Sequence, residues 1–147
     1  MLPSSPFRNP SKNWPIRQLP GLSEENQHLL IACGIETTLQ LLAQTRTDGQ
    51  RRAIAQQLRI HPQHLIKWIA LADLARIPDV GCQHCGLLLH AGILSPAQLA
   101  QTPLPRLHRQ LLKLQVALFQ RRDLCPSLDQ VARWIQQAQR LPPLEKG

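Results

Sequence analysis

Apolar residues recur at helical spacing along most of the chain, in runs that begin after a polar cap or a proline and end near a glycine. In the segment 62–76, which begins with a proline, Leu65, Trp68, Ile69 and Ala72 fall on one face of a helix. Almost no segment shows the period-two alternation of a half-buried strand. The pattern therefore predicts an all-α protein.

The same pattern occurs twice. A shift of 58 positions superimposes the two copies without a gap, and it pairs Pro20 with Pro78, Leu29-Leu30 with Leu87-Leu88, Gly34-Ile35 with Gly92-Ile93 and Gln40-Leu41 with Gln98-Leu99. Each copy has a proline turn, about ten residues at helical spacing, a glycine stop and a polar cap before another apolar run. Since a repeat usually forms one supersecondary unit, we expect 19–43 and 77–101 to superimpose as pairs of short helices joined by tight hairpins.

Further helices are predicted around this repeat. Together the predicted helices cover 24–33, a short segment after Thr37-Thr38, 51–58, 62–76, a segment from the second hairpin to His90, a short segment after Ser95-Pro96, 106–122 and 131–138. The sequence VARWI at 131–135 echoes LIKWI at 65–69, so Trp68 and Trp134 are expected in the core. We divide the chain into a basic Pro/Ser-rich extended arm (1–18), ordered where Trp14 and Ile16 dock, a first repeat (19–76), a second repeat (77–140) and a tail (141–147). The two repeats are expected to pack as one compact helical domain.

The charge balance points to an anionic partner. Seventeen lysines and arginines against nine acids give a formal net charge of +8, so the candidate partners are nucleic acid, an acidic protein face and an anionic membrane. No apolar run approaches the ~20 residues of a membrane span, and residues 1–17 lack the apolar core of a secretory signal. We therefore expect a cytoplasmic protein without a membrane span, in which the four cysteines are thiols or metal ligands rather than a disulfide framework.

The two turns, LPGLS at 19–23 and IPDVG at 77–81, resemble the helix-hairpin-helix motif, whose usual form is an apolar residue, proline, glycine, an apolar residue and glycine. The tandem arrangement is also similar to a bacterial DUF4332-like family of helix-hairpin-helix-like proteins. In the motif, backbone amides of the hairpin and of the following helix face a DNA phosphate. The resemblance implies a phosphate site at Gly21, Leu22 and Ser23, and a poorer one at Val80 and Gly81. The alternative is that both hairpins only pack helices.

Basic residues gather in two places. The first group is Arg46, Arg51, Arg52 and Arg59, and the second is Arg106, Arg109, Lys113, Arg121 and Arg122. On a helix, Arg106, Arg109 and Lys113 form one stripe, opposite a stripe that includes Leu107 and Leu111. A solvated helix face is the alternative interpretation. Aromatic residues make up only 3% of the chain, so a base-stacking platform for single strands is poorly supported.

Cys82 and Cys85 are separated by two residues, a spacing that lets both sulfurs bind one metal or form a disulfide. Their place near a helix N-terminus predicts a lowered thiolate pKa and faster reaction than at the other cysteines. A structural zinc normally needs four ligands, and Cys33, Cys125, His84 and His90 are the remaining candidates. The first repeat has Glu24 and Gln27 at the matching positions, so we expect small packed residues, with no metal and no cofactor.

No arrangement of acids, histidines or nucleophiles matches a catalytic motif, so we expect neither an enzyme nor a small-molecule substrate. The leading hypothesis is a non-catalytic module that binds duplex DNA without sequence preference. It would use the first hairpin together with Arg51, Arg52, Arg106, Arg109 and Lys113. The alternative is a protein-interaction adapter that docks through 81–105, which carries no charged residue, with Cys82 and Cys85 as a redox or metal switch. Basic clusters on one face would favour the first hypothesis, whereas separated clusters and an apolar patch would favour the second.

Overall fold

The structure is a computed structural model, and it describes residues 11–119 and 125–142. The helices are a 3-10 helix (Ile16–Gln18), α1 (Glu24–Ala32), α2 (Thr38–Ala43), α3 (Asp48–Leu58), α4 (Pro62–Ala75), α5 (Gly81–His90), α6 (Pro96–Ala100), α7 (Leu104–Phe119) and α8 (Leu128–Arg140). Among the residues described, no helix is both long and apolar enough to cross a membrane. The same residues hold no named strand, so the protein is all-α, as the apolar pattern predicts.

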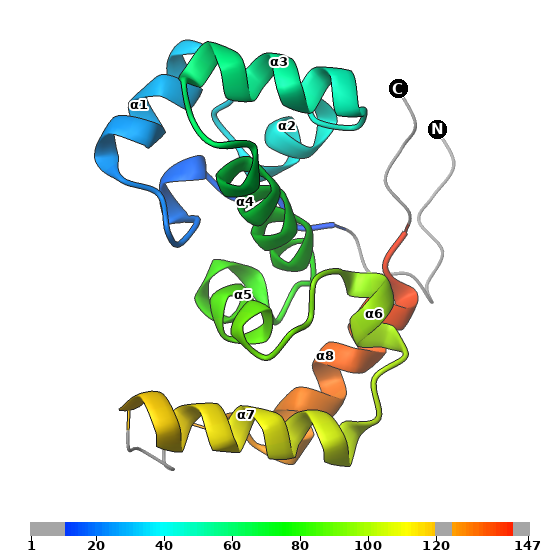
Figure 1. Ribbon diagram of the computed structural model, residues 1–147. Coiled ribbons are helices and arrows are strands. Elements are labelled where there is room, and N and C mark those ends of the chain that lie inside the picture. Colours follow the sequence, from blue (N-terminus) through cyan, green and yellow to red (C-terminus); the bar gives the residue numbers. More distant parts are fainter. Residues whose placement is uncertain (1–10, 120–124, 143–147) are drawn as a thin grey trace.

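The helices are stacked along the long direction of the molecule (Figure 1). Helices α1, α2 and α3 lie at one end, α4 and α5 cross the middle, and α7 lies at the other end. Helix α4 packs against α2, α3 and α5, whereas α5 packs against α7, and α8 packs against both α6 and α7. The pair α4 and α5 therefore joins the helices of the first sequence repeat to those of the second.

One continuous cluster of buried apolar side chains runs through both sequence repeats. Positions 58 residues apart are buried in both, with at most 3% exposure, as in Leu30 and Leu88, Ile35 and Ile93, and Leu41 and Leu99. Trp68 and Trp134 also lie in this cluster, as predicted. Three pairs of positions matched by the sequence shift are thus buried in both copies.

The helix ends also match between the repeats. Gly34 and Gly92 follow α1 and α5 with φ of 85° and 90°, a left-handed conformation that glycine adopts without strain. The hydroxyls of Thr37 and Ser95 then accept hydrogen bonds from the backbone amides of Gln40 and Gln98, and so cap α2 and α6. These are local agreements, and superposition of the whole segments 19–43 and 77–101 stays a prediction.

Residues 12–19 form a strap along the first repeat that also reaches Gly81 of the second. The indole N–H of Trp14 donates to the carbonyl of Ala75 at 2.7 Å, at the end of α4. Two residues on, the amide of Ile16 donates to the carbonyl of Glu36 at 2.8 Å, and the Ile16 side chain is only 1% exposed. Trp14 and Ile16 therefore dock as the sequence predicts, while residues 1–10 lie outside the described part.

A buried ion pair fixes the end of α4. Nη1 of Arg76 lies 3.1 Å from Oδ1 of Asp73, and the Arg76 side chain is only 5% exposed. Its other terminal nitrogen, Nη2, donates to the carbonyl of Pro142 at 2.9 Å and so connects α4 to the segment after α8. Burial raises the pKa of Asp73, and the neighbouring Arg76 charge opposes that rise. The Arg76 guanidinium is thus held away from water at the joint between the repeats, whereas 24% of the Asp73 side chain is exposed.

Candidate functional site

The first hairpin is open but carries negative charge. Gly21 is exposed with φ of 85°, and nothing lies within 4 Å of the position of an added Cβ. The hydroxyl of Ser23 accepts the amide of Asn26 at 3.1 Å, which caps α1, and Leu22 is half-buried against the core. Two exposed glutamates, Glu24 and Glu25, occupy the first turn of α1. Because such carboxylates already complement the helix dipole, they would repel a phosphate at the same place.

The second hairpin is closed by the strap. Gly81 is buried with φ of 52°, and a Cβ there would lie 2.8 Å from Cζ2 of Trp14. Val80 is 1% exposed, and the carboxylate of Asp79 lies 3.3 Å from Nη1 of Arg133 on α8. Gly81 therefore faces an indole rather than solvent, which is incompatible with the phosphate contact that the resemblance implied. At this hairpin the geometry favours the alternative, in which the turn packs helices.

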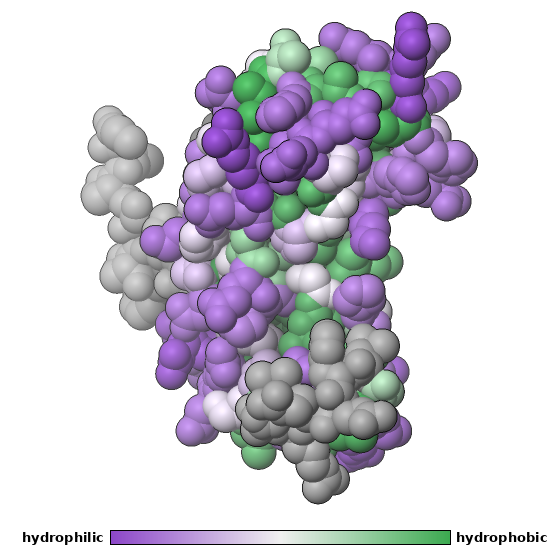
Figure 2. All heavy atoms as spheres, turned by 90° about the vertical axis from the view of Figure 1, so that its left-hand side faces the viewer, coloured by the Kyte–Doolittle hydropathy of each residue, from purple (hydrophilic) through white to green (hydrophobic). Residues whose placement is uncertain are grey.

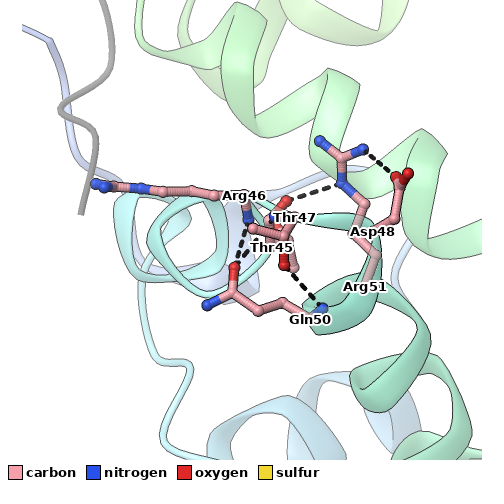
Figure 3. Close-up of polar contacts among 6 residues, drawn as sticks. All are labelled: Thr45, Arg46, Thr47, Asp48, Gln50 and Arg51. Atoms are coloured by element: carbon pink, nitrogen blue, oxygen red, sulfur yellow. Dashed lines mark hydrogen bonds and ion pairs between the residues drawn. The ribbon is translucent and has the colours of Figure 1, made fainter.

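The first basic group does not converge on one point. Nε of Arg51 donates to the carbonyl of Thr45 at 2.8 Å, and its Nη1 lies 3.4 Å from Oδ1 of Asp48 (Figure 3). Figure 3 also shows the Arg46 side chain pointing away from Arg51. Arg52, by contrast, is exposed. Arg51 thus helps to fix the start of α3, which leaves less of its guanidinium available to a ligand.

The second basic group forms a cationic face on α7. Arg106, Arg109 and Lys113 are exposed, while Leu107 and Leu111 are fully buried, so the predicted amphipathic stripe is confirmed. The other two members of the group, Arg121 and Arg122, lie outside the described residues.

The two basic groups lie far apart. Figure 1 places α3 and α7 at opposite ends of the molecule, with α4 and α5 between them. The sequence hypothesis combined Arg51 and Arg52 with Arg106, Arg109 and Lys113 in one phosphate-binding surface. The structure instead divides these residues between two ends of the molecule. The hypothesis missed this separation because the spacing of charges along the chain does not reveal the order in which the helices stack.

The thiols of Cys82 and Cys85 lie in an apolar environment. Cys85 is buried and Cys82 is half-buried, and Sγ of Cys85 donates to the carbonyl of Cys82 at 3.7 Å. Burial raises the pKa of Cys82 to about 11 and that of Cys85 to about 12. The expected lowering by the helix N-terminus is therefore wrong, because loss of hydration outweighs the helix dipole. Within the described part, no cluster of three or more potential ligands could hold a metal.

Slow alkylation of native Cys82 is the corresponding prediction. A pKa of about 11 against the ordinary 9.0 makes its thiolate about 100-fold scarcer near neutral pH. In a variant with Cys33→Ser, Cys85→Ala and Cys125→Ser, iodoacetamide should react about 100-fold more slowly with the native protein than with the protein in urea. Since unfolded thiols ionise first, the free energy of unfolding of the natural chain should fall as pH rises from about 9 towards 11. Faster reaction of the native thiol would restore the helix-dipole interpretation.

An apolar groove between α4 and α5 is the feature that the sequence did not reveal. Ile66 and Ile69 of α4 form one side, and Leu89 and Leu94 form the other, around a volume of about 630 Å³. Ile66 is 56% exposed and Leu94 is 59% exposed. Figure 2 shows hydrophobic residues reaching the surface among hydrophilic ones at the waist of the molecule. The sequence does show that Ile66, although apolar, lies off the apolar face of α4. Its position next to Leu89 and Leu94 of the second repeat becomes apparent from the fold.

Comparison with known proteins assigns the chain to a family. The model of a family described as a domain of unknown function, DUF4332, matches residues 20–141, which is most of the chain. The chain belongs to the DUF4332 family. No curated protein and no solved structure matches it. The family match begins at Pro20, just after the strap, so Trp14 lies outside the matched region.

Proposed function

We propose that this chain is a non-catalytic binding module that docks a protein partner in the groove between α4 and α5. The observation that carries the proposal is the groove itself, in which two large aliphatic side chains, Ile66 and Leu94, are more than half exposed. Contiguous apolar surface of this kind typically marks an interaction site. The separation of the basic groups on α3 and α7 also favours the adapter over the composite DNA-binding surface.

A segment of a protein fits this groove better than a small molecule. A small-molecule site is usually a cleft or cavity that buries most of the surface of its ligand. Ile66 and Leu94 instead project into solvent at the rim, where they can contact side chains of a larger partner. The four cysteines are free thiols, which supports the reducing, cytoplasmic location that forms part of the proposal.

Photo-crosslinking in the cells that produce this protein tests the proposal. A photoreactive phenylalanine analogue at position 66 or 94 should give a protein adduct of defined mass that survives nuclease treatment. The matched control is the same analogue at Leu128, which is 51% exposed on α8 and is not one of the residues that line the groove. We expect the adduct at 66 and 94 and its absence at 128. Adducts of equal yield at all three positions, or none at 66 and 94, would refute docking in the groove.

Binding of duplex nucleic acid through α7 alone is a second candidate. The observation that favours it is the stripe of Arg106, Arg109 and Lys113, all exposed on a helix whose sequence contains no acid. Phosphate contacts of this kind carry no sequence preference and weaken steeply with salt. This smaller footprint excludes Gly81, which is buried, and Arg51 and Arg52, which lie at the other end of the molecule.

A further inference from the structure

The chemistry of the groove identifies the kind of segment it accepts. We infer that the partner segment is an amphipathic helix with apolar side chains on one face and carboxylates flanking them. This inference rests on the proposed function, because it names the partner of the same groove. It follows from three properties of the lining, namely the form of its walls, the residue types it contains and its charge.

The secondary structure of the groove excludes two common modes of peptide recognition. A strand-like peptide needs an exposed sheet edge, and the described residues contain no sheet. A polyproline segment docks between aromatic side chains, and the groove lining contains none. Ile66 and Ile69 instead lie three residues apart on α4, so they form a ridge on one side of the groove. A helix whose own apolar residues recur every three or four positions can pack against such a ridge.

The charge of the groove selects acidic flanking residues. Lys67 is exposed at the groove, and no salt bridge joins it to another described residue. Arg51 also lines the groove, but its guanidinium is already paired with Asp48 at 3.4 Å, so Lys67 is the cation that the groove offers. The carboxylate of Asp73, also in the lining, is already paired with Arg76. The groove therefore offers net positive charge beside an apolar floor, which attracts carboxylates and repels lysines.

The same charge argues against a second copy of this chain as the occupant. Each copy carries a net charge of +8, so association of two copies through a face that is itself cationic would be opposed by repulsion. An acidic partner gains attraction from the whole chain and from Lys67 in particular. The expected occupant is thus a different protein with an acidic, helical binding segment.

Two synthetic peptides test this inference on the full chain. Both have roughly 18 residues and the same leucine stripe at helical spacing, and they differ only in carrying glutamate or lysine at the remaining positions. Fluorescence anisotropy should show binding of the glutamate peptide and at least about tenfold weaker binding of the lysine peptide. The glutamate peptide should also gain helical circular dichroism when it binds.

Charge reversal in the protein gives the sharper result. Lys67→Glu should weaken binding of the glutamate peptide by about tenfold and strengthen binding of the lysine peptide. Arg17→Glu in the strap is the matched control, since Arg17 is exposed, lies outside the groove lining and undergoes the same charge reversal, and it should leave both affinities within about twofold. The double variant Ile66→Ser with Leu94→Ser should lose binding of the glutamate peptide while keeping its thermal unfolding curve, because both side chains are exposed.

The outcomes separate this inference from the proposed function. Equal binding of the two peptides, unaffected by Lys67→Glu, would refute the acidic partner and leave groove docking in place. Failure of both peptides, with groove-specific crosslinks still present in cells, would refute the helical acidic segment alone. Binding of the glutamate peptide that survives Ile66→Ser with Leu94→Ser but is lost in Arg17→Glu would refute docking in the groove as well.

Discussion

Replacing Asp73 by alanine should lower the free energy of unfolding by about 3–5 kcal/mol, as measured by urea denaturation. The variant leaves the guanidinium of Arg76 unpaired, although its side chain is only 5% exposed. A charge in that position loses its hydration without gaining an opposite charge nearby. The loss is also expected to loosen the segment after α8, since Nη2 of Arg76 donates to the carbonyl of Pro142.

The double variant Asp73→Leu with Arg76→Met provides the control. It removes both charges and keeps apolar volume, so it should cost far less than Asp73→Ala alone, because a buried pair can often be replaced by packed apolar residues. Equal losses in the two variants would show that packing at these positions matters and that pairing of the charges does not.

Gly81→Ala should destabilise the protein by about 2–4 kcal/mol. A left-handed conformation costs a non-glycine residue about 1 kcal/mol, and the new Cβ would lie 2.8 Å from Cζ2 of Trp14. The indole cannot move away freely, because its N–H donates to the carbonyl of Ala75 at 2.7 Å. Denaturant unfolding of the variant measures the combined cost.

The variant Gly92→Ala measures the cost of backbone strain without a steric clash, so comparison with it gives the cost of the clash at Gly81. Gly92 has φ of 90°, and nothing lies within 4 Å of the position of an added Cβ, so its substitution should cost only about 1 kcal/mol. In a Trp14→Ala background, the destabilisation caused by Gly81→Ala should fall to a similar value, because residues 14 and 81 are then no longer in contact. A cost for Gly81→Ala equal to that of Gly92→Ala in the natural chain would contradict closure of the hairpin by the strap.

Local chemistry made much of the fold predictable. Glycines at helix ends, proline at the start of α4 and apolar spacing are short-range signals, and the pattern placed Trp68 and Trp134 in the core. The starts of α3 and α8 were predicted three residues late. Thr47 and Ser127 accept the amides of Gln50 and Gln130 and so begin these helices earlier than their apolar residues indicate.

The candidate site depended on contacts that are distant in sequence. The sequence around Gly81 does not indicate that Trp14 covers this residue. The sequence around Cys82 places the thiol near a helix N-terminus, but it does not indicate the burial that raises the pKa of the thiol. The groove likewise forms only because α4 packs against α5, which brings Ile66 close to Leu94. Such features become visible once the order of the stacked helices is known.

The most direct measurement is a map of backbone amide chemical shifts in isotope-labelled protein during titration with the glutamate peptide. Binding in the groove predicts the largest changes at Ile66, Lys67, Ile69 and Leu94, with Arg106, Arg109 and Lys113 little affected. A parallel titration with duplex DNA should leave the groove amides unchanged. Peptide-induced changes confined to α7, or spread evenly over the surface, would contradict a binding module whose functional surface is the groove between α4 and α5.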